Sequence, residues 1–176
     1  KLLEHLEIID REISRSDDVI QRLLEITKGE DLKKTPTDLK TLAFEAFNYA
    51  DLTNRSHLIV DFEPKHFLIN VDKLLFRQVL FNIFLNSIQA MPTGGEIIMS
   101  ISMKEAKMIK IIITDQGKGI EENYLKKIFD PLYTDKEDGI GLGLSLCRDL
   151  ISRHGGKILA KSLVSVGTTI EIDLPS

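Results

Sequence analysis

The sequence is poor in the features that mark secreted, disulfide-bonded and membrane-spanning proteins. It has one cysteine and no tryptophan among its 176 residues. The single cysteine, Cys147, excludes an intramolecular disulfide and fits a reducing compartment, and its helical surroundings predict a small buried side chain. No apolar run approaches the roughly 18 residues of a membrane span, and no secretory leader is apparent. We therefore expect a soluble chain in the cytoplasm.

Positive charge is also scarce. The 23 Lys and Arg residues are outnumbered by 27 Asp and Glu residues, which gives a net charge of −4. Because nucleic-acid surfaces need a basic excess, and no basic cluster here is longer than a pair, we expect no nucleic-acid partner. The content of 43% hydrophobic and 28% charged residues is that of an ordinary globular domain able to bury a core.

Residues 1–28 have the pattern of one long amphipathic helix. Its apolar positions form a coiled-coil-like seam that needs a partner helix, in cis or in a homodimer. The seam consists of Leu2, Leu6, Ile9, Ile13, Ile20 and Leu23. Gly29, a charge run and Pro36 then predict a linker over residues 29–36, so the main domain is expected over residues 37–176.

The main domain alternates between helical and strand patterns. Helices are predicted over residues 37–52, 72–91 and 121–128 and in the segment that ends at 154, and strands over 58–62, 67–71, 96–103, 108–114, 157–164 and 168–174. This order predicts an α/β (α+β) two-layer sandwich, in which a mixed, mostly antiparallel sheet carries three longer helices on one face.

The helix predicted over residues 72–91 is apolar nearly all round, except for one stripe of amides. Gln78, Asn82, Asn86 and Gln89 recur at steps of four, four and three, so they share one helix face. An amide offers an oxygen to a hard cation and an N–H to a phosphate, so the stripe suits a magnesium–nucleotide complex. The alternative from this helix alone is a row of core amides bonded to backbone.

Asp115 follows a predicted core strand and is followed by Gly117 and Gly119. Glycines at this spacing let the backbone come close to a ligand that the carboxylate holds. A carboxylate accepts hydrogen bonds and therefore suits an exocyclic amino group such as that of adenine. The alternative is an ordinary turn after a strand, since such turns often carry Asp and Gly.

Three alternating glycines, Gly139, Gly141 and Gly143, open the next predicted helix after a long polar loop over residues 129–138. They direct backbone N–H groups and the positive end of the helix dipole toward an anion, which is phosphate-binding chemistry. The spacing matches neither a Walker loop nor the dinucleotide fingerprint. The alternative is close helix packing through glycine.

Four segments in this order resemble the catalytic ATP-binding domain of the sensor histidine kinases of two-component systems, in the GHKL superfamily that also holds gyrase and the heat-shock ATPase chaperones. They are residues 77–86, similar to the asparagine box, 115–120, similar to the first glycine box, 129–136, similar to the phenylalanine box, and 139–146, similar to the second glycine box. Gly167-Thr168-Thr169 resembles the closing glycine–threonine element. The joint order and spacing of these segments are specific to the family.

The resemblance implies that the chain binds ATP and Mg²⁺. Asn86 would give its amide oxygen to Mg²⁺, and Asn82, one turn earlier, would support the metal and the phosphates. Asp115 would accept the adenine amino group, and Gly117 and Gly119 would leave room for the base.

On the phosphate side, the resemblance implies that Gly141 and Gly143, with Leu142 between them, present N–H groups to the phosphates. The preceding loop would be a mobile ATP lid, with Phe129 anchoring its base and Lys136 contacting the γ-phosphate. Other residues implied in nucleotide binding are Ile120, Gly139, Leu144 and Thr168. Family members often have a basic residue where this chain has Gln89, so the positive charge at the γ-phosphate would rest on Lys136.

The N-terminal region resembles the second helix of the family's dimerisation and phosphotransfer hairpin. None of the histidines is followed by the Glu-x-x-Arg/Asn-Pro pattern of the phosphoacceptor, so the acceptor is expected outside this chain; the four are His5, His57, His66 and His154. The resemblance then implies a histidine kinase fragment that passes phosphate to an external histidine, for relay to the receiver domain of a response regulator. The intact kinase can still be tethered to a membrane.

Of the histidines, we expect His57 and His66 at the surface and His154 at a helix end, where the helix dipole would stabilise its charge.

Two other functions remain open. One is an ATPase or serine protein kinase of the same superfamily, such as an anti-sigma regulator. Hydrolytic relatives place a water-activating glutamate four residues before the magnesium asparagine, and here that position holds Asn82. The other is a non-enzymatic dimerisation module that keeps the fold, against which the complete glycine segments argue.

Overall fold

The computed structural model describes residues 31–52, 55–61, 67–104, 108–136 and 139–175. The strands in these residues are β1 (Lys34–Asp38), β2 (Ser56–Asp61), β3 (Leu68–Asp72), β4 (Gly95–Lys104), β5 (Met108–Asp115), β6 (Lys157–Leu163) and β7 (Gly167–Pro175). The helices are α2 (Leu39–Ala50), α3 (Lys73–Ala90), α4 (Glu122–Leu125) and α5 (Gly143–Arg153). The helix predicted over residues 1–28 and its dimer seam lie outside the described residues.

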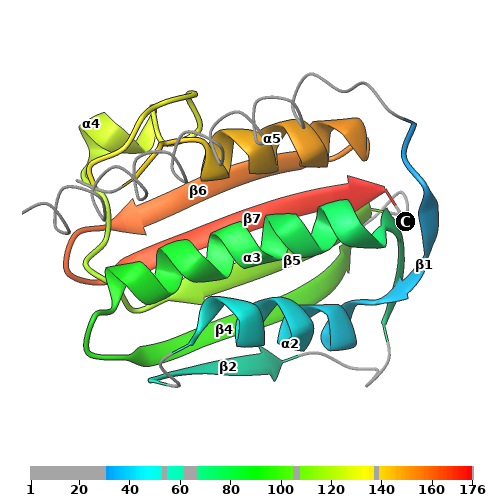
Figure 1. Ribbon diagram of the computed structural model, residues 1–176, viewed down its shortest axis with the longest axis horizontal. Coiled ribbons are helices and arrows are strands. Elements are labelled where there is room, and N and C mark those ends of the chain that lie inside the picture. Colours follow the sequence, from blue (N-terminus) through cyan, green and yellow to red (C-terminus); the bar gives the residue numbers. More distant parts are fainter. Residues whose placement is uncertain (1–30, 53–54, 62–66, 105–107, 137–138, 176) are drawn as a thin grey trace, which may run out of the picture.

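Five strands form the main sheet in the order β2-β4-β5-β7-β6 (Figure 1). β2 pairs with β4 in parallel, and the other three pairings are antiparallel. The prediction of a mixed, mostly antiparallel sheet is confirmed. This topology brings the end of β5 and the start of β7 together, since Asp115 pairs with Thr168.

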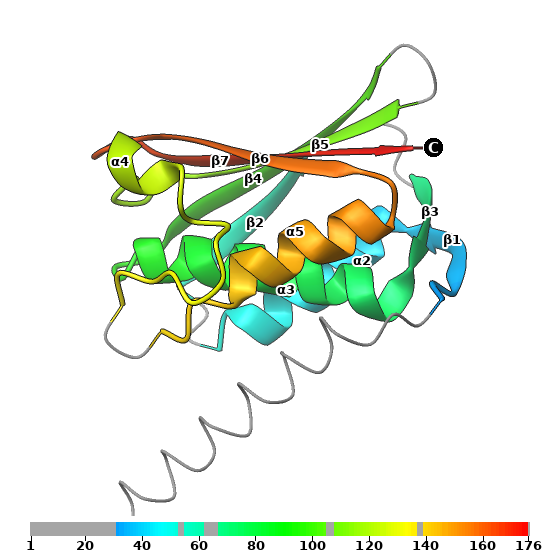
Figure 2. The ribbon, with the colours of Figure 1, turned by 90° about the horizontal axis from the view of Figure 1, so that it is seen from above.

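The three longer helices α2, α3 and α5 cover one face of this sheet, as predicted (Figure 2). In β5 every second side chain is buried, including Ile109, Ile111 and Ile113, because alternate residues of a strand point to opposite faces. The buried residues meet the apolar face of α3, where Phe84 packs edge-on against Phe47 of α2 with ring centroids 5.8 Å apart. The two layers therefore share one core.

Aspartates begin two of these helices. Asp38 accepts a hydrogen bond from the N–H of Thr41 at the start of α2, and Asp72 accepts from the N–H groups of Leu74 and Leu75 at the start of α3. Each carboxylate satisfies first-turn donors that a helix leaves without partners. Both starting points agree with the sequence prediction.

The segment before α2 differs from the prediction. Residues 34–36 are predicted as part of a linker, but they belong to β1, which pairs antiparallel with β3 in a separate two-stranded sheet. The Lys33 N–H also donates to Asp72 Oδ2 at 3.0 Å. Pairing with a strand more than thirty residues away outweighs the local turn preference of this segment.

His154 also differs from its prediction as a charged residue stabilised by a helix dipole. It is buried at the end of α5, where its Nε2 accepts from the Asp72 N–H at 3.0 Å and its Nδ1 lies 2.7 Å from the Leu150 carbonyl oxygen. Burial lowers the pKa of His154 below its ordinary value. A neutral ring that donates from Nδ1 and accepts at Nε2 satisfies both contacts, so His154 joins the ends of α5 and β3 as a neutral side chain.

Of the remaining predictions for single residues and short segments, some are confirmed and others are not. Cys147 is fully buried, as predicted, and His57 is exposed, whereas His66 lies outside the described residues. The helix predicted over residues 121–128 is limited to the four residues of α4. Within the part of the chain that the structure describes, no helix has both the length and the apolarity needed to cross a bilayer.

Candidate functional site

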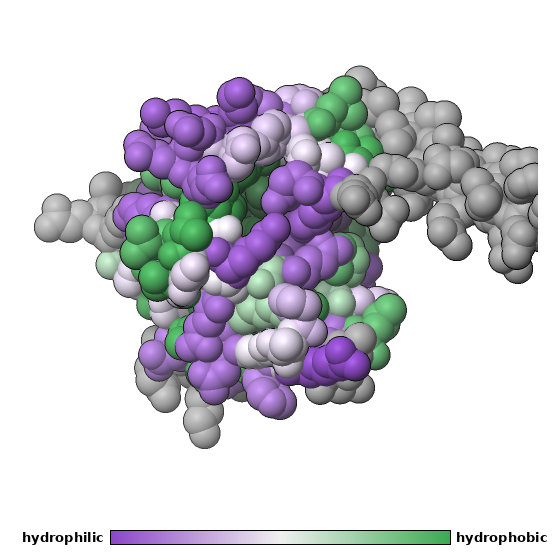
Figure 3. All heavy atoms as spheres, turned by 90° about the vertical axis from the view of Figure 1, so that its left-hand side faces the viewer, coloured by the Kyte–Doolittle hydropathy of each residue, from purple (hydrophilic) through white to green (hydrophobic). Residues whose placement is uncertain are grey.

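The predicted site residues gather at one end of the two layers. This end carries the C-terminal end of α3, the end of β5, the start of β7 and the loop between α4 and α5, on the left of Figure 1. Seen from that side, hydrophilic residues surround a hollow with apolar side chains inside it (Figure 3). The sheet topology thus brings together segments that are far apart in sequence.

Asp115 is a buried carboxylate at this end that accepts three hydrogen bonds from the protein. It is 5% exposed, and its Oδ1 accepts from the backbone N–H groups of Gly117 at 2.9 Å and Thr168 at 3.1 Å. Its Oδ2 accepts from the Ser87 hydroxyl of α3 at 2.9 Å. A carboxylate has about four acceptor positions, so one on Oδ2 is left for an amino group of a ligand.

The two glycines after Asp115, Gly117 and Gly119, are packed closely against neighbouring segments. A Cβ on Gly117 would lie 2.6 Å from the Ala90 Cβ, and one on Gly119 would lie 2.2 Å from the Leu163 carbonyl oxygen. Gly119 also has φ +71°, which side-chain-bearing residues rarely adopt. Both glycines therefore let the loop after β5 pack against α3 and β6. This packed loop forms one wall of the site, beside Asp115.

Ile120 and Thr168 belong to the same wall. The Ile120 N–H donates to the Ser162 hydroxyl at 2.9 Å, and the Ser162 hydroxyl lies 2.9 Å from the Thr168 hydroxyl. Thr168 is buried and reaches Asp115 through its backbone. The structure thus brings the predicted residues Asp115, Gly117, Ile120 and Thr168 into one hydrogen-bonded group.

Asn82 lies on α3 beneath the glycine loop. It is 4% exposed, and its Nδ2 has no hydrogen-bond partner among the described residues. A Cβ on Gly143 would lie 3.4 Å from Asn82 Oδ1, so the start of α5 approaches this amide closely. Because a buried donor without a partner is costly, the site favours a ligand acceptor such as a phosphate oxygen at this point.

The N-terminus of α5 lacks the capping that α2 and α3 have. Its N-cap residue, Leu142, has no side-chain capping bond, although the first-turn N–H groups of a helix have no intrahelical partners. Leu142 is buried, and Gly141 has φ +72° with the Leu132 backbone in the position of a Cβ. The N–H groups of Gly143 and Leu144 in this first turn are thus available to an anion.

The loop between α4 and α5 connects to α3 through Lys136. The Lys136 ammonium donates to Asn86 Oδ1 at 2.9 Å and to Gln89 Oε1. Burial is the main cause that lowers the pKa of Lys136, and nearby Asp135 opposes it. Asp135 itself pairs with Lys118 at 3.0 Å, and this hydrogen bond lowers the pKa of Asp135.

Other contacts fix the ends of this loop. Phe129, at the start of this loop, is half-buried against the core cluster. Arg148 of α5 lies 3.9 Å from Asp130, and Gly139 donates its N–H to the Lys136 carbonyl oxygen at 3.1 Å. The described part of the loop therefore contacts the core at Phe129, α5 at Asp130 and α3 at Lys136.

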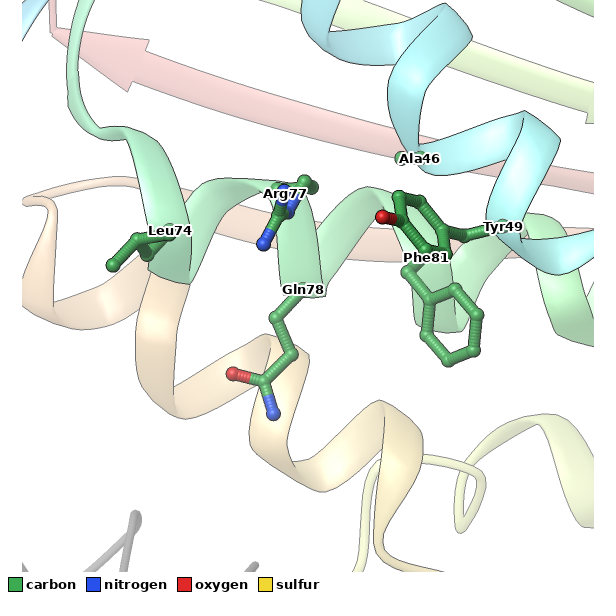
Figure 4. Close-up of a pocket in the computed structure, with 6 residues that line it drawn as sticks. All are labelled: Ala46, Tyr49, Leu74, Arg77, Gln78 and Phe81. Atoms are coloured by element: carbon green, nitrogen blue, oxygen red, sulfur yellow. The ribbon is translucent and has the colours of Figure 1, made fainter.

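Gln78, the first amide of the predicted stripe, does not share this site. It lines a groove of about 380 Å³ between α2 and α3, together with Tyr49, Arg77 and Phe81 (Figure 4). In this groove the Arg77 guanidinium lies 5.8 Å from the centre of the Tyr49 ring. The stripe therefore divides, and only Asn82, Asn86 and Gln89 face the candidate site.

The residues present fit a divalent cation at Asn86. Its amide oxygen is a ligand of the kind that Mg²⁺ takes, and that oxygen already receives a cationic group, the Lys136 ammonium. No group of three His, Cys, Asp or Glu side chains with metal-binding geometry occurs among the described residues. A cation at Asn86 would hence rely on phosphate oxygens for the rest of its coordination, which is the usual arrangement for Mg²⁺ with a nucleotide.

Sequence reasoning missed one residue of the site, Ser87, and one contact, that between Gln89 and Lys136. Ser87 is 4% exposed and is the side-chain donor to Asp115 Oδ2. Its position directly after Asn86 and on the sheet-facing side of α3 is the signal that indicates it. The Gln89 contact depends on the path of the loop, which periodicity along α3 does not reveal.

Comparison with known proteins agrees with this geometry. Residues 71–176 match the family described as histidine kinase-, DNA gyrase B- and HSP90-like ATPase. The chain is 34% identical over 175 residues to the signal transduction histidine-protein kinase AtoS of Escherichia coli strain K12. That alignment covers 98% of this chain and 29% of AtoS, so the chain spans under a third of this relative.

Solved structures give the same result. The nucleotide-free catalytic domain of the histidine kinase ThkA superposes with a TM-score of 0.71 at 27% identity, over 81% of this chain and 95% of that domain. ThkA in complex with the response regulator protein TrrA superposes with a TM-score of 0.78 at 26% identity, over 99% of this chain and 51% of that one.

Proposed function

Because the chain belongs to the histidine kinase-, DNA gyrase B- and HSP90-like ATPase family, we propose that it is the nucleotide-binding part of a two-component sensor kinase. In this role it binds Mg-ATP and transfers the γ-phosphoryl group to a histidine that another segment or chain supplies. The activity of the whole protein is part of this proposal, since the chain corresponds to 29% of AtoS.

One observation carries the proposal: the uncapped N-terminus of α5 lies beside Asn82, whose buried Nδ2 has no hydrogen-bond partner among the described residues. Both groups are hydrogen-bond donors that an apolar or cationic ligand would leave unsatisfied. A phosphate chain offers acceptor oxygens to both and benefits from the helix dipole. The buried carboxylate of Asp115 at the other end of the site then suits an amino-bearing base such as adenine.

The residues of the site act by binding and orientation. Asp115 accepts from the adenine amino group while Gly117 and Thr168 keep its Oδ1 in place. Gly143 and Leu144 donate N–H groups to phosphate oxygens, and Lys136 provides a positive charge from the lid. Mg²⁺ bound at Asn86 would neutralise part of the negative charge of the phosphates. Phosphoryl transfer depends mainly on such positioning and neutralisation.

The proposed partners follow from the same assignment. The acceptor imidazole has to reach the γ-phosphate, and a receiver domain of a response regulator then takes the phosphoryl group. The complex of ThkA with TrrA supports a response regulator as the partner, because ThkA is 26% identical to this chain. The homodimer through residues 1–28 and the cytoplasmic location stay predictions.

Phosphate transfer from labelled ATP tests this proposal. The chain alone should bind Mg-ATP in calorimetry and acquire no phosphohistidine, because its histidines lack the acceptor pattern. A separate fragment that carries an acceptor helix should become labelled when it docks on this chain, with a label that is stable in base and labile in acid. Acid-stable label on serine would favour the serine kinase alternative, and rapid phosphate release without transfer would favour an ATPase.

A further inference from the structure

The lid lysine is held by two neutral amides of α3. Lys136 donates to Asn86 Oδ1 at 2.9 Å and to Gln89 Oε1, and these acceptors are three residues apart, on one face of the helix. The neighbouring acid of the lid, Asp135, is engaged with Lys118 at 3.0 Å. The ammonium therefore rests on oxygens that attract it less strongly than a carboxylate would.

Asn86 has two uses for the same oxygen. Its Oδ1 now accepts from the ammonium, and the same atom is the Mg²⁺ ligand under the proposed function. Two cations on one amide oxygen repel each other, so Asn86 has to release the ammonium when it takes the metal. Gln89 Oε1 is a separate acceptor that the proposed function does not assign to the metal, so it can keep its hydrogen bond to the ammonium.

We propose that Gln89 is a positioning residue of the ATP site, which keeps the Lys136 ammonium at the γ-phosphate end while Asn86 exchanges that ammonium for Mg²⁺. This inference rests on the proposed function. An ammonium has three N–H donors, so Lys136 can stay bound to Gln89 and still donate to a phosphate oxygen. Gln89 thus acts through Lys136, which itself contacts the phosphate.

The structure also supplies a matched control. Gln89 and Gln78 are both amides on α3, but Gln78 lines the groove between α2 and α3, away from the lid. Gln89 is exposed, so Gln89→Leu removes an acceptor without opening the core. Gln78→Leu makes the same chemical change on the same helix.

Calorimetric titration with ATP and ADP, each in excess Mg²⁺ and in EDTA, tests the role of Gln89. In Mg²⁺, Gln89→Leu should weaken ATP about fivefold, the loss of one partly exposed charge-assisted hydrogen bond. In EDTA the loss should be under about twofold, because Asn86 then still holds the ammonium. ADP, which has no γ-phosphate, should change by less than about twofold in both conditions, and Gln78→Leu should match the unsubstituted chain.

The outcomes separate the two proposals. Unchanged ATP affinity in Mg²⁺, an equal loss for ATP and ADP, or a loss as large in EDTA as in Mg²⁺ would overturn the role of Gln89. If the unsubstituted chain bound neither nucleotide, the proposed function itself would fail.

Discussion

At the base end of the proposed ATP site, both oxygens of Asp115 already accept hydrogen bonds from the protein. At the phosphate end, Asn82 Nδ2 has no partner among the described residues, and Leu142 gives α5 no side-chain cap. The base end is thus already hydrogen-bonded within the protein, whereas the phosphate end has donors for which the proposed function supplies phosphate oxygens. Under the proposed function, the pre-formed end would select the base, and the loop that carries Lys136 would adjust to the phosphates.

The largest expected effect comes from a substitution at the base end of the site. Gly119→Ala should lower the free energy of unfolding by about 3 kcal/mol. The alanine would be strained at a positive φ, and its Cβ would also clash with the Leu163 carbonyl oxygen at 2.2 Å. Urea denaturation measures the loss. Gly155→Ala is the matched control. Gly155 also has a positive φ, +84°, but the nearest atom to its new Cβ outside the adjacent residues is Pro175 Cγ, at an ordinary contact distance of 3.5 Å. Equal losses would show that the close packing beside Asp115 is unimportant.

The next effect concerns recognition of the base. Asp115→Asn should weaken ATP by about 1.5–3 kcal/mol, the worth of a hydrogen bond to a buried charged group. ADP should weaken by the same factor, since both nucleotides carry adenine. Calorimetry measures both affinities, with thermal unfolding as a check of the fold. If Asp115→Asn bound Mg-ATP as well as the unsubstituted chain, the assignment of Asp115 to the adenine would be wrong.

Asn86→Ala should affect the phosphate end alone. Losing the amide oxygen should reduce the gain in ATP affinity that Mg²⁺ provides, by about tenfold, or about 1.4 kcal/mol. In EDTA the variant should bind ATP within a small factor of the unsubstituted chain. Titrations with and without Mg²⁺ give the comparison. An equal loss in both conditions would assign Asn86 to packing instead of to the metal.

The smallest effect lies away from both ends, at His154. The pKa of His154 is lowered by burial below the value of 6.5 that it takes in the unfolded chain. The unfolded state therefore binds the proton more readily, so stability is full above pH 6.5 and falls below it, by up to about 1.4 kcal/mol per pH unit. Urea denaturation between pH 7.5 and 5.5 should show this slope, and it should be reduced in His154→Gln but kept in His57→Gln. A slope of the opposite sign would mean that His154 is charged in the fold.

The parts of the fold that follow from local pattern were predictable. The alternation in β5, the apolar surface of α3 and the aspartate caps at Asp38 and Asp72 are properties of short segments. The Asp115 wall was also predictable, because its glycines are close to it in sequence. The predicted bounds of β5 and α3 lie within one residue of those in the structure.

The features that escaped prediction depend on contacts between distant segments. β1 exists because it pairs with β3, and His154 is neutral because it meets the Asp72 N–H 82 residues away. The division of the amide stripe has the same origin, since the lid reaches Gln89 but not Gln78. Periodicity gives the face of a helix on which a side chain lies, but not which segment covers that face.

Hydrogen–deuterium exchange on the chain with and without Mg-ATP tests the contrast between the two ends most directly. The N–H groups of Gly117 and Thr168, which already donate to Asp115, should be protected before nucleotide is added. The N–H groups of Gly143 and Leu144 should exchange quickly in the free chain and become protected only with Mg-ATP. Slow exchange at Gly143 and Leu144 in the free chain, or equal gains in protection at both ends, would contradict this contrast. The contrast requires that the base end is formed in the free chain and that the phosphate end is completed only by bound nucleotide.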